Sequence, residues 1–135
     1  MISIIIPVLN EEEKLANLLQ ELKQIEDPIS FEIIVVDGGS QDQTVAIASK
    51  FAAVYQLKQA NRGAQLKLGA EKSSGDILWF LHSDSKLADY RQGLRQIQDS
   101  LKDPRYSAGY FQLVFDSQDF FYRYLIKVNQ RQNTI

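Results

Sequence analysis

Apolar segments of strand length alternate with amphipathic segments along most of the chain. Residues 2–8, 31–36, 53–57 and 77–81 are mostly apolar and rich in β-branched or aromatic residues. Such runs are typical of strands buried on both faces of a sheet. Between them, apolar residues recur every three or four positions, as at Leu15, Leu18, Leu19 and Leu22, which predicts helices lying on that sheet. The alternation predicts an α/β fold, a doubly wound and mainly parallel sheet with helices on both faces.

Polar residues and glycines predict where these elements begin and end. Asn10 is expected to cap the first helix, with Glu13 completing a capping box. Ser40 or Asp42 is expected to cap the second helix, and Gly75 to close the third as its C′ residue.

The pattern changes after residue 107. Residues 109–116 alternate between apolar and polar side chains, which predicts a half-exposed strand. Residues 120–128 carry an aromatic face that predicts a helix, and residues 129–135 are a polar segment expected to be a flexible tail. The length of 135 residues suits a single domain, 1–135.

Composition narrows the class of protein. An apolar fraction of 44% permits a real core, and a net charge of −2 argues against nonspecific nucleic-acid binding. The absence of cysteine excludes disulfides and cysteine-ligated zinc. No run is long enough for a transmembrane span and none has the basic start of a signal peptide, so a cytoplasmic location is expected.

Polar side chains follow the predicted strands at the edge where ligands bind in doubly wound sheets. They are Glu11, Asp37, Arg62, His82 and Asp84. Carboxylates with a divalent metal and an arginine could together hold a nucleoside diphosphate, because the metal bridges carboxylate and phosphate oxygens. Each residue also has a structural alternative: helix start for Glu11 and Arg62, a glycine turn for Asp37, a structural imidazole for His82, and a helix cap for Asp84. No dinucleotide-binding, P-loop or nucleophile-elbow motif occurs in the chain.

Four ordered motifs together resemble the family 2 glycosyltransferases of GT-A fold. They are SIIIPVLNEE (residues 3–12), IVVDGGSQDQT (34–44), NRG (61–63) and LWFLHSD (78–84), and a weaker match continues through residues 109–116. The resemblance implies that Pro7 and Glu11 contact a nucleotide, with Leu9 and Arg62 in the same binding set. It also implies that Asp37 hydrogen-bonds the base, and we expect Asp37 to be only partly buried, so that its removal would weaken nucleotide binding without unfolding the protein.

The resemblance also implies a metal site at the fourth motif. The family's usual pair of aspartates reads His82-Ser83-Asp84 here, which leaves Asp84 as the principal ligand of Mg²⁺ or Mn²⁺ and His82 as a secondary one. The expected strand order is three-two-one-four, with the site where the order reverses between strands one and four.

The function implied is transfer of a sugar from a nucleotide-diphosphate sugar to an unknown acceptor. We expect this chain to be the donor-binding half, with the acceptor side and the catalytic base in a part of the protein beyond it; Asp116 and Asp119 are the alternatives for a base within the chain. Self-association through helix 120–128 is expected if its aromatic face is uncovered. Two other functions remain open: a noncatalytic nucleotide-binding or interaction module derived from a glycosyltransferase, and a nucleotidyltransferase.

Overall fold

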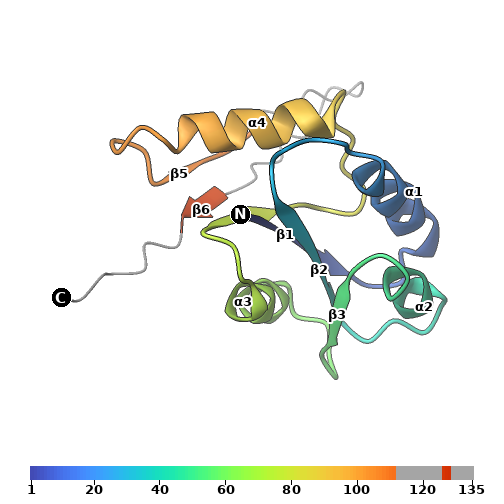
Figure 1. Ribbon diagram of the computed structural model, residues 1–135. Helices are drawn as coiled ribbons and strands as arrows, with labels where there is room; N and C mark the ends of the chain where they lie inside the picture. The colour runs from blue at the N-terminus through green and yellow to red at the C-terminus, as the bar shows by residue number, and fades with distance from the viewer. Residues whose placement is uncertain (112–125, 129–135) are drawn as a thin grey trace, which may run out of the picture.

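A computed structural model of the protein describes residues 1–111 and 126–128. Strands and helices alternate through most of this range (Figure 1). The strands are β1 (Ile2–Val8), β2 (Phe31–Asp37), β3 (Ala53–Gln56), β4 (Ile77–Phe80), β5 (Ala108–Gly109) and β6 (Ile126–Val128). The helices are α1 (Glu12–Lys23), α2 (Thr44–Ala48), α3 (Arg62–Lys72) and α4 (Tyr90–Ser100).

The sheet has the order β3-β2-β1-β4-β6-β5. β1 pairs in parallel with β2 on one side and with β4 on the other, and β2 pairs in parallel with β3. The predicted order three-two-one-four is therefore confirmed. β6 adds to the free edge of β4 in the antiparallel direction and β5 pairs with β6, so the sheet is mixed at that end.

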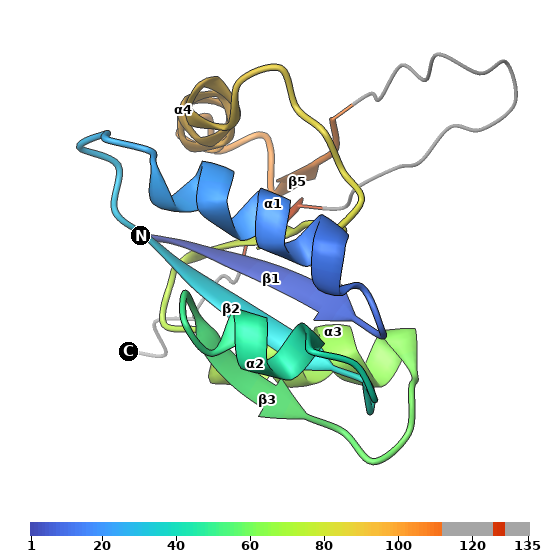
Figure 2. The same cartoon turned by 90° about the vertical axis from the view of Figure 1, so that its right-hand side faces the viewer.

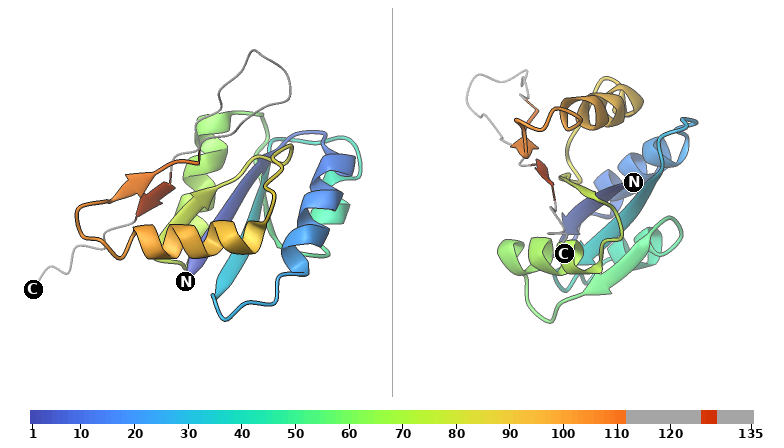
Figure 3. Two further views of the ribbon diagram at one scale, coloured as in Figure 1. Left: turned by 90° about the horizontal axis from the view of Figure 1, so that it is seen from above. Right: turned by 60° about the vertical axis from the view of Figure 1, so that its left-hand side comes forward.

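Helices cover both faces of the sheet, as predicted (Figure 2). On one face, alternate residues of β1 pack with the buried side of α1 and with residues of α2 and α4. On the opposite face, Ile5, Ile34, Val36 and Leu78 pack against Leu68 and Ala70 of α3. Figure 3 shows α3 set apart from α1, α2 and α4 by the sheet. Among the described residues, no helix has the length and apolar content needed to cross a bilayer.

Three of the predicted helix ends are wrong. Neither Ser40 nor Asp42 caps α2, because Gln43 holds its N-cap position and no side chain makes a cap bond there. The capping box at Asn10 and Glu13 does not form, because α1 begins one residue later, with Glu11 in the N-cap position and no side-chain cap bond. Asn10 instead adopts a left-handed φ of 49° in the preceding loop.

Gly75 is not a left-handed C′ residue, since Gly39 is the one glycine with positive φ in the described part of the chain. Its lack of a side chain serves close packing instead: a Cβ at Gly75 would lie 2.6 Å from both the Met1 carbonyl oxygen and Ser3 Oγ.

The prediction for the last part of the chain is also wrong where the structure describes it. Residues 126–128, expected at the end of an aromatic helix, form strand β6. The aromatic face at residues 120–125, the rest of the strand predicted over 109–116, Asp116 and Asp119, and the tail at 129–135 lie outside the described residues.

Helix α3 lies unusually close to the sheet at Gly69. A Cβ at this position would collide with Ile5 Cγ2 and approach Val36 Cγ2 to 3.2 Å. We expect Gly69→Ala to lower the free energy of unfolding by about 1–3 kcal/mol, the usual cost of overpacking a buried contact. Gly63→Ala in the same helix is the matched control, because a Cβ there meets only Asn61 Oδ1 at an ordinary 3.5 Å. Urea unfolding of both variants checks this, and equal midpoints would contradict the close packing.

Candidate functional site

The carboxyl ends of β1, β2 and β4 meet at one edge of the sheet. The loops that follow them carry Leu9 and Glu11, the glycine turn after Asp37, and the His82–Ser85 turn. Helix α3 begins at the same edge, where Asn61 accepts a hydrogen bond from the Ala64 N–H at 2.9 Å and so caps it. Four separate chain segments therefore converge here, as the sequence predicted.

A pocket of about 220 Å³ lies between the end of β1 and the start of α3. Its lining includes four of the five predicted nucleotide-binding residues, Pro7, Leu9, Glu11 and Arg62. Leu9 is an apolar side chain that is 42% exposed, which leaves an apolar surface at the pocket. The fifth predicted residue, Asp37, does not line the pocket. Three lining residues were missed by the sequence reasoning, namely Val8, Ala60 and Gln65.

Hydrogen bonds join the loop after β1 to the loop after β2. The Asn10 N–H donates to Ser40 Oγ at 2.8 Å, and the Gln41 N–H donates to Asn10 Oδ1 at 2.7 Å. The Glu11 N–H donates to Thr44 Oγ1 at 2.9 Å. The left-handed turn at Asn10 lets its backbone and its side chain face the second loop together, so this residue fixes one wall of the site.

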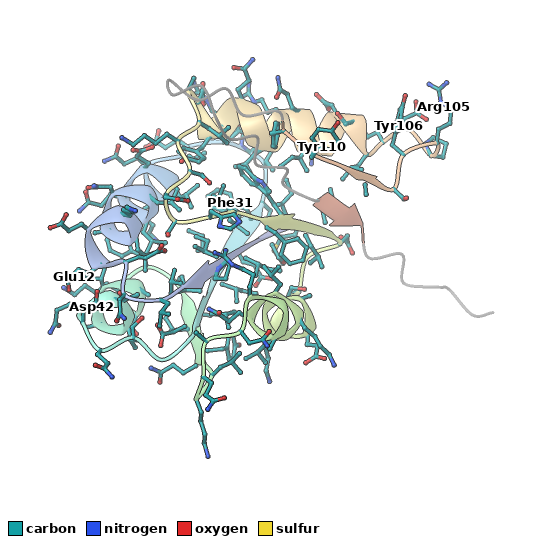
Figure 4. All side chains as sticks on the ribbon, turned by 180° about the vertical axis from the view of Figure 1, so that it is seen from behind. Glu12, Phe31, Asp42, Arg105, Tyr106 and Tyr110 are labelled. Atoms are coloured by element: carbon teal, nitrogen blue, oxygen red, sulfur yellow. The ribbon has the colours of Figure 1, made fainter. Side chains whose placement is uncertain are left out.

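The same junction continues at the start of α1. The Gln43 N–H donates to Glu12 Oε2 at 2.8 Å. Figure 4 labels Glu12 and Asp42 at this junction. Hydrogen bonds from the Thr44 side chain and from backbone N–H groups lower the pKa of Asp42, which keeps this carboxylate ionised beside the helix start.

Asp37 is fully buried, so the expectation of partial burial is wrong. One carboxylate oxygen accepts from the N–H groups of Gly39 and Ser40, both at 2.9 Å, and the other accepts from the Ser40 hydroxyl. The structural alternative, a carboxylate that holds its own glycine turn, describes this geometry. The loop thus uses three of the acceptor positions of this carboxylate.

Glu11 lies between the pocket and the end of β4. Its carboxylate accepts a hydrogen bond from the buried Ser83 hydroxyl, which joins the first and fourth motifs across the site. Burial raises the pKa of Glu11, and the nearby Asp84 raises it further, while Lys14 and Arg62 partly offset the effect. The charge of Asp84 is thus close enough to disfavour ionisation of Glu11.

Arg62 and His82 contact each other at the mouth of the site. Arg62 Nη1 lies 2.7 Å from His82 Nδ1 and 3.4 Å from Nε2. Because a guanidinium can only donate, Nδ1 accepts and the imidazole is neutral in this arrangement. Burial lowers the pKa of His82, Arg62 lowers it further, and Asp84 acts in the opposite direction. Nδ1 therefore faces a cationic donor, which does not fit a metal ligand through that atom.

Asp84 is an exposed carboxylate in the turn after β4. It does not cap the next helix, because Asp89 accepts from the Gln92 N–H at 3.1 Å and is the cap of α4. A carboxylate oxygen is the ligand type that Mg²⁺ and Mn²⁺ prefer, so Asp84 fits the metal that the motif implies. Within residues 1–111 and 126–128, no group of three or more His, Cys, Asp or Glu side chains is placed to hold a metal ion. Asp84 would thus need ligand oxygens from beyond the described residues.

The motifs at this edge match a known family over nearly the whole chain. The model of the family described as glycosyl transferase family 2 matches residues 3–134. The chain belongs to glycosyltransferase family 2. This confirms the resemblance that the four motifs indicated.

Family 2 relatives share about a third of their sequence positions with this chain over the matched parts. The chain is 40% identical over 91 residues to the glycosyltransferase AglE of Haloferax volcanii. This match covers 62% of the chain and 30% of AglE. The chain is 29% identical over 118 residues to the human dolichyl-phosphate beta-glucosyltransferase, covering 72% of the chain and 36% of the relative. The chain thus spans about a third of the length of these curated relatives.

Solved structures share the fold. Staphylococcus aureus TarS (residues 1–349) superimposes with a TM-score of 0.74 at 23% identity, covering 88% of this chain and 37% of that one. The mannosyltransferase PcManGT from Pyrobaculum calidifontis, solved with GDP-Man and Mn²⁺, has a TM-score of 0.71 at 20% identity over 83% of this chain and 35% of its own. The predicted α/β architecture of the GT-A glycosyltransferases is confirmed.

The burial of Asp37 changes what its removal should do. Asp37→Ala removes both carboxylate oxygens, which leaves the N–H groups of Gly39 and Ser40 and the Ser40 hydroxyl without their acceptor. We expect the free energy of unfolding to fall by about 2–4 kcal/mol. Asp99→Ala, the same change on the exposed side of α4, is the control and should stay close to wild type. Urea unfolding measures both, and a loss below about 1 kcal/mol for Asp37→Ala would contradict the role of Asp37 in the loop.

The raised pKa of Glu11 predicts a pH dependence of stability. A carboxyl group whose pKa is higher in the folded state binds more protons there, so the folded state gains stability as the pH falls through that window. Glu11→Gln removes this dependence. We expect the variant to be more stable than wild type at pH 7, by less than about 1 kcal/mol because the group is partly exposed, and equal to it near pH 4.

Urea midpoints between about pH 4 and pH 8 measure this difference. Glu26→Gln, at an exposed position on the loop after α1, controls for the loss of one negative charge. A Glu11→Gln variant less stable than wild type at pH 7 would show that the bond from Ser83 outweighs the cost of burial.

Proposed function

We propose that this chain is the donor-binding part of a glycosyltransferase and holds a nucleotide-diphosphate sugar together with a divalent cation. The observation that carries this is the position of the pocket. It lies at the carboxyl end of β1, where the strand order reverses between β2 and β4, the place where doubly wound sheets bind nucleotides. Family membership supports the same conclusion.

The pocket residues suit the parts of such a donor. Pro7 and Leu9 offer apolar surface for a base, and the Arg62 guanidinium has the planar fork that fits diphosphate oxygens. Asp37 contributes by holding the glycine turn after β2 and not through a direct contact. Glu11 holds the turn after β4 in place through Ser83.

Asp84 is the residue that would hold Mg²⁺ or Mn²⁺, with diphosphate oxygens completing the coordination. The cation would supply a Lewis acid that neutralises the charge developing on the leaving diphosphate. The chain's own part is to fix geometry: the Tyr90 hydroxyl donates to the Ser85 carbonyl at 2.7 Å and holds the turn that presents Asp84. In this scheme Arg62 exchanges its contact with His82 for a contact with phosphate, and His82 is the candidate for the secondary ligand.

The catalytic base is the part of the reaction that the described residues do not supply. Asp89 caps α4, while Asp99 pairs with Lys102 at 2.9 Å and Asp103 pairs with Arg105. We therefore expect the 135-residue chain to bind the donor but to be slow or inactive in transfer. Rapid turnover by the purified chain would contradict this.

Titration with UDP, GDP, CDP and ADP, with and without Mn²⁺, tests the proposed function. We expect at least one nucleotide to bind, and Mn²⁺ to tighten that binding about tenfold or more, because Asp84 and the diphosphate share the ion. Without nucleotide the metal should bind weakly. Asp84→Asn should remove the effect of Mn²⁺, whereas Asp99→Asn removes one charge far from the edge and should retain it.

The same titration separates the proposal from its alternative. A noncatalytic module derived from a glycosyltransferase would bind the nucleotide equally well with or without Mn²⁺, and Asp84→Asn would change nothing. Absence of binding by every nucleotide would overturn the proposed function altogether.

A further inference from the structure

Gln65 is a buried amide in the pocket wall that the sequence motifs did not single out. It lies in the first turn of α3, is only 5% exposed, and lines the pocket. Its Nε2 group donates to the Val8 carbonyl at 3.0 Å and to the Val36 carbonyl at 2.9 Å. These are the carbonyls at the carboxyl ends of β1 and β2, so the amide joins the two strands that form the floor of the site.

The two bonds fix which way the amide points. Both hydrogens of Nε2 are used, and a flipped amide would set Oε1 against two carbonyl oxygens. Oε1 is therefore held on the opposite side of the group. A Cβ at Gly38 would lie 3.2 Å from Oε1 and 3.0 Å from Ala60 Cα, so only a glycine fits between this oxygen and Ala60.

No side chain or backbone group among the described residues donates a hydrogen bond to Gln65 Oε1. Oε1 is not sealed in the core, since Trp79 Nε1 is the one buried side-chain polar atom without a partner among the described residues. An acceptor that no protein group uses, in a residue that lines a pocket, points to a donor on the ligand that the pocket takes.

The chemistry around Oε1 selects the part of the ligand that reaches it. Oε1 and the Glu11 carboxylate disfavour a phosphate beside them, whereas Arg62 in the same lining suits the diphosphate. Leu9, Pro7 and Ala60 supply apolar surface that suits the face of a flat ring. We propose that Gln65 Oε1 accepts a hydrogen bond from the ring N–H of a nucleobase, and that it selects uracil or guanine over cytosine and adenine, which lack a ring N–H at this edge.

This inference rests on the proposed function and deepens it. It assigns base reading to a residue of α3, in place of the Asp37 carboxylate, which is fully buried and does not line the pocket. Gln65 is thus a specificity-determining residue whose orientation depends on the strand ends themselves.

The first experiment removes the donor from the ligand and leaves the protein intact. Wild-type affinities for UDP and GDP are compared with those for 3-deazauridine and 1-deazaguanosine diphosphates, in which C–H replaces the ring N–H. We expect the tighter of UDP and GDP to lose about tenfold on this change, the value of one hydrogen bond to a fixed buried acceptor. CDP and ADP should also bind about tenfold or more weakly than that nucleotide.

The second experiment removes the acceptor. Gln65→Met keeps the length of the side chain, and Gln98→Met makes the same change at an exposed position of α4 as the control. In Gln65→Met the natural and deaza nucleotides should bind within twofold of each other, whereas Gln98→Met should keep the wild-type difference. If Gln65→Met does not fold, the comparison in the wild-type protein still decides.

Three results would overturn the inference and leave the proposed function standing. They are equal binding of natural and deaza nucleotides by the wild type, tighter binding of CDP or ADP than of UDP and GDP, and a deaza penalty that persists in Gln65→Met. Equal binding of natural and deaza nucleotides would mean that a ribose hydroxyl, and not the ring N–H, donates to Oε1. Failure of every nucleotide to bind would overturn the proposed function and this inference together.

Discussion

Strand β1 is the constraint on which the rest of the molecule depends. All seven of its residues are buried, and it pairs in parallel with β2 on one edge and β4 on the other. A strand buried on both faces needs helices on both sides, which accounts for α1 and α3 lying on opposite faces. The pairing of β1 also brings the carboxyl ends of β2 and β4 beside its own, so the edge that carries the site follows from strand pairing in the core.

The site is held by polar bonds between loops more than by apolar packing. Asp37 closes the glycine turn, Asn10 joins that turn to the loop after β1, and Glu11 reaches across to Ser83. Each of these bonds uses a group that sequence motifs mark as functional. In this family member, several motif residues thus shape the loops, and the pocket is lined partly by other residues.

Sequence patterns predicted the four parallel strands and the edge where polar residues gather, because apolar periodicity and the rules of parallel sheets determine both. The strand order followed from the resemblance to the GT-A family. The burial of Asp37 was not predicted, because it depends on how the glycine turn folds back over the strand end, and the strand pattern does not contain that information. The turn at Asn10 was missed because asparagine suits both a helix cap and a left-handed loop.

Two other misses have the same kind of cause. Residues 126–128 join the sheet although their spacing suited a helix, because the edge of β4 offers backbone partners that periodicity ignores. One feature of the sequence could have identified Gln65. It lies at helical spacing from Leu68 and Gly69, on the face of α3 that packs against the sheet, where a polar residue is unusual. A polar residue on a buried stripe is worth testing as a strand-end contact.

The pairing of β1 with β4 also bears on how the chain folds. Met1 and Asp76, which meet beside the start of these strands, are 75 residues apart in the sequence. Loop-closure entropy makes such distant parallel pairing slow, and β1 is an isoleucine-rich strand that must wait for it. Until β4 arrives, one edge of β1 presents unpaired backbone groups of the kind that recruit other chains. The strand that organises the native core is therefore also the segment most exposed to misassembly during synthesis, and chaperone protection is of most value in that interval.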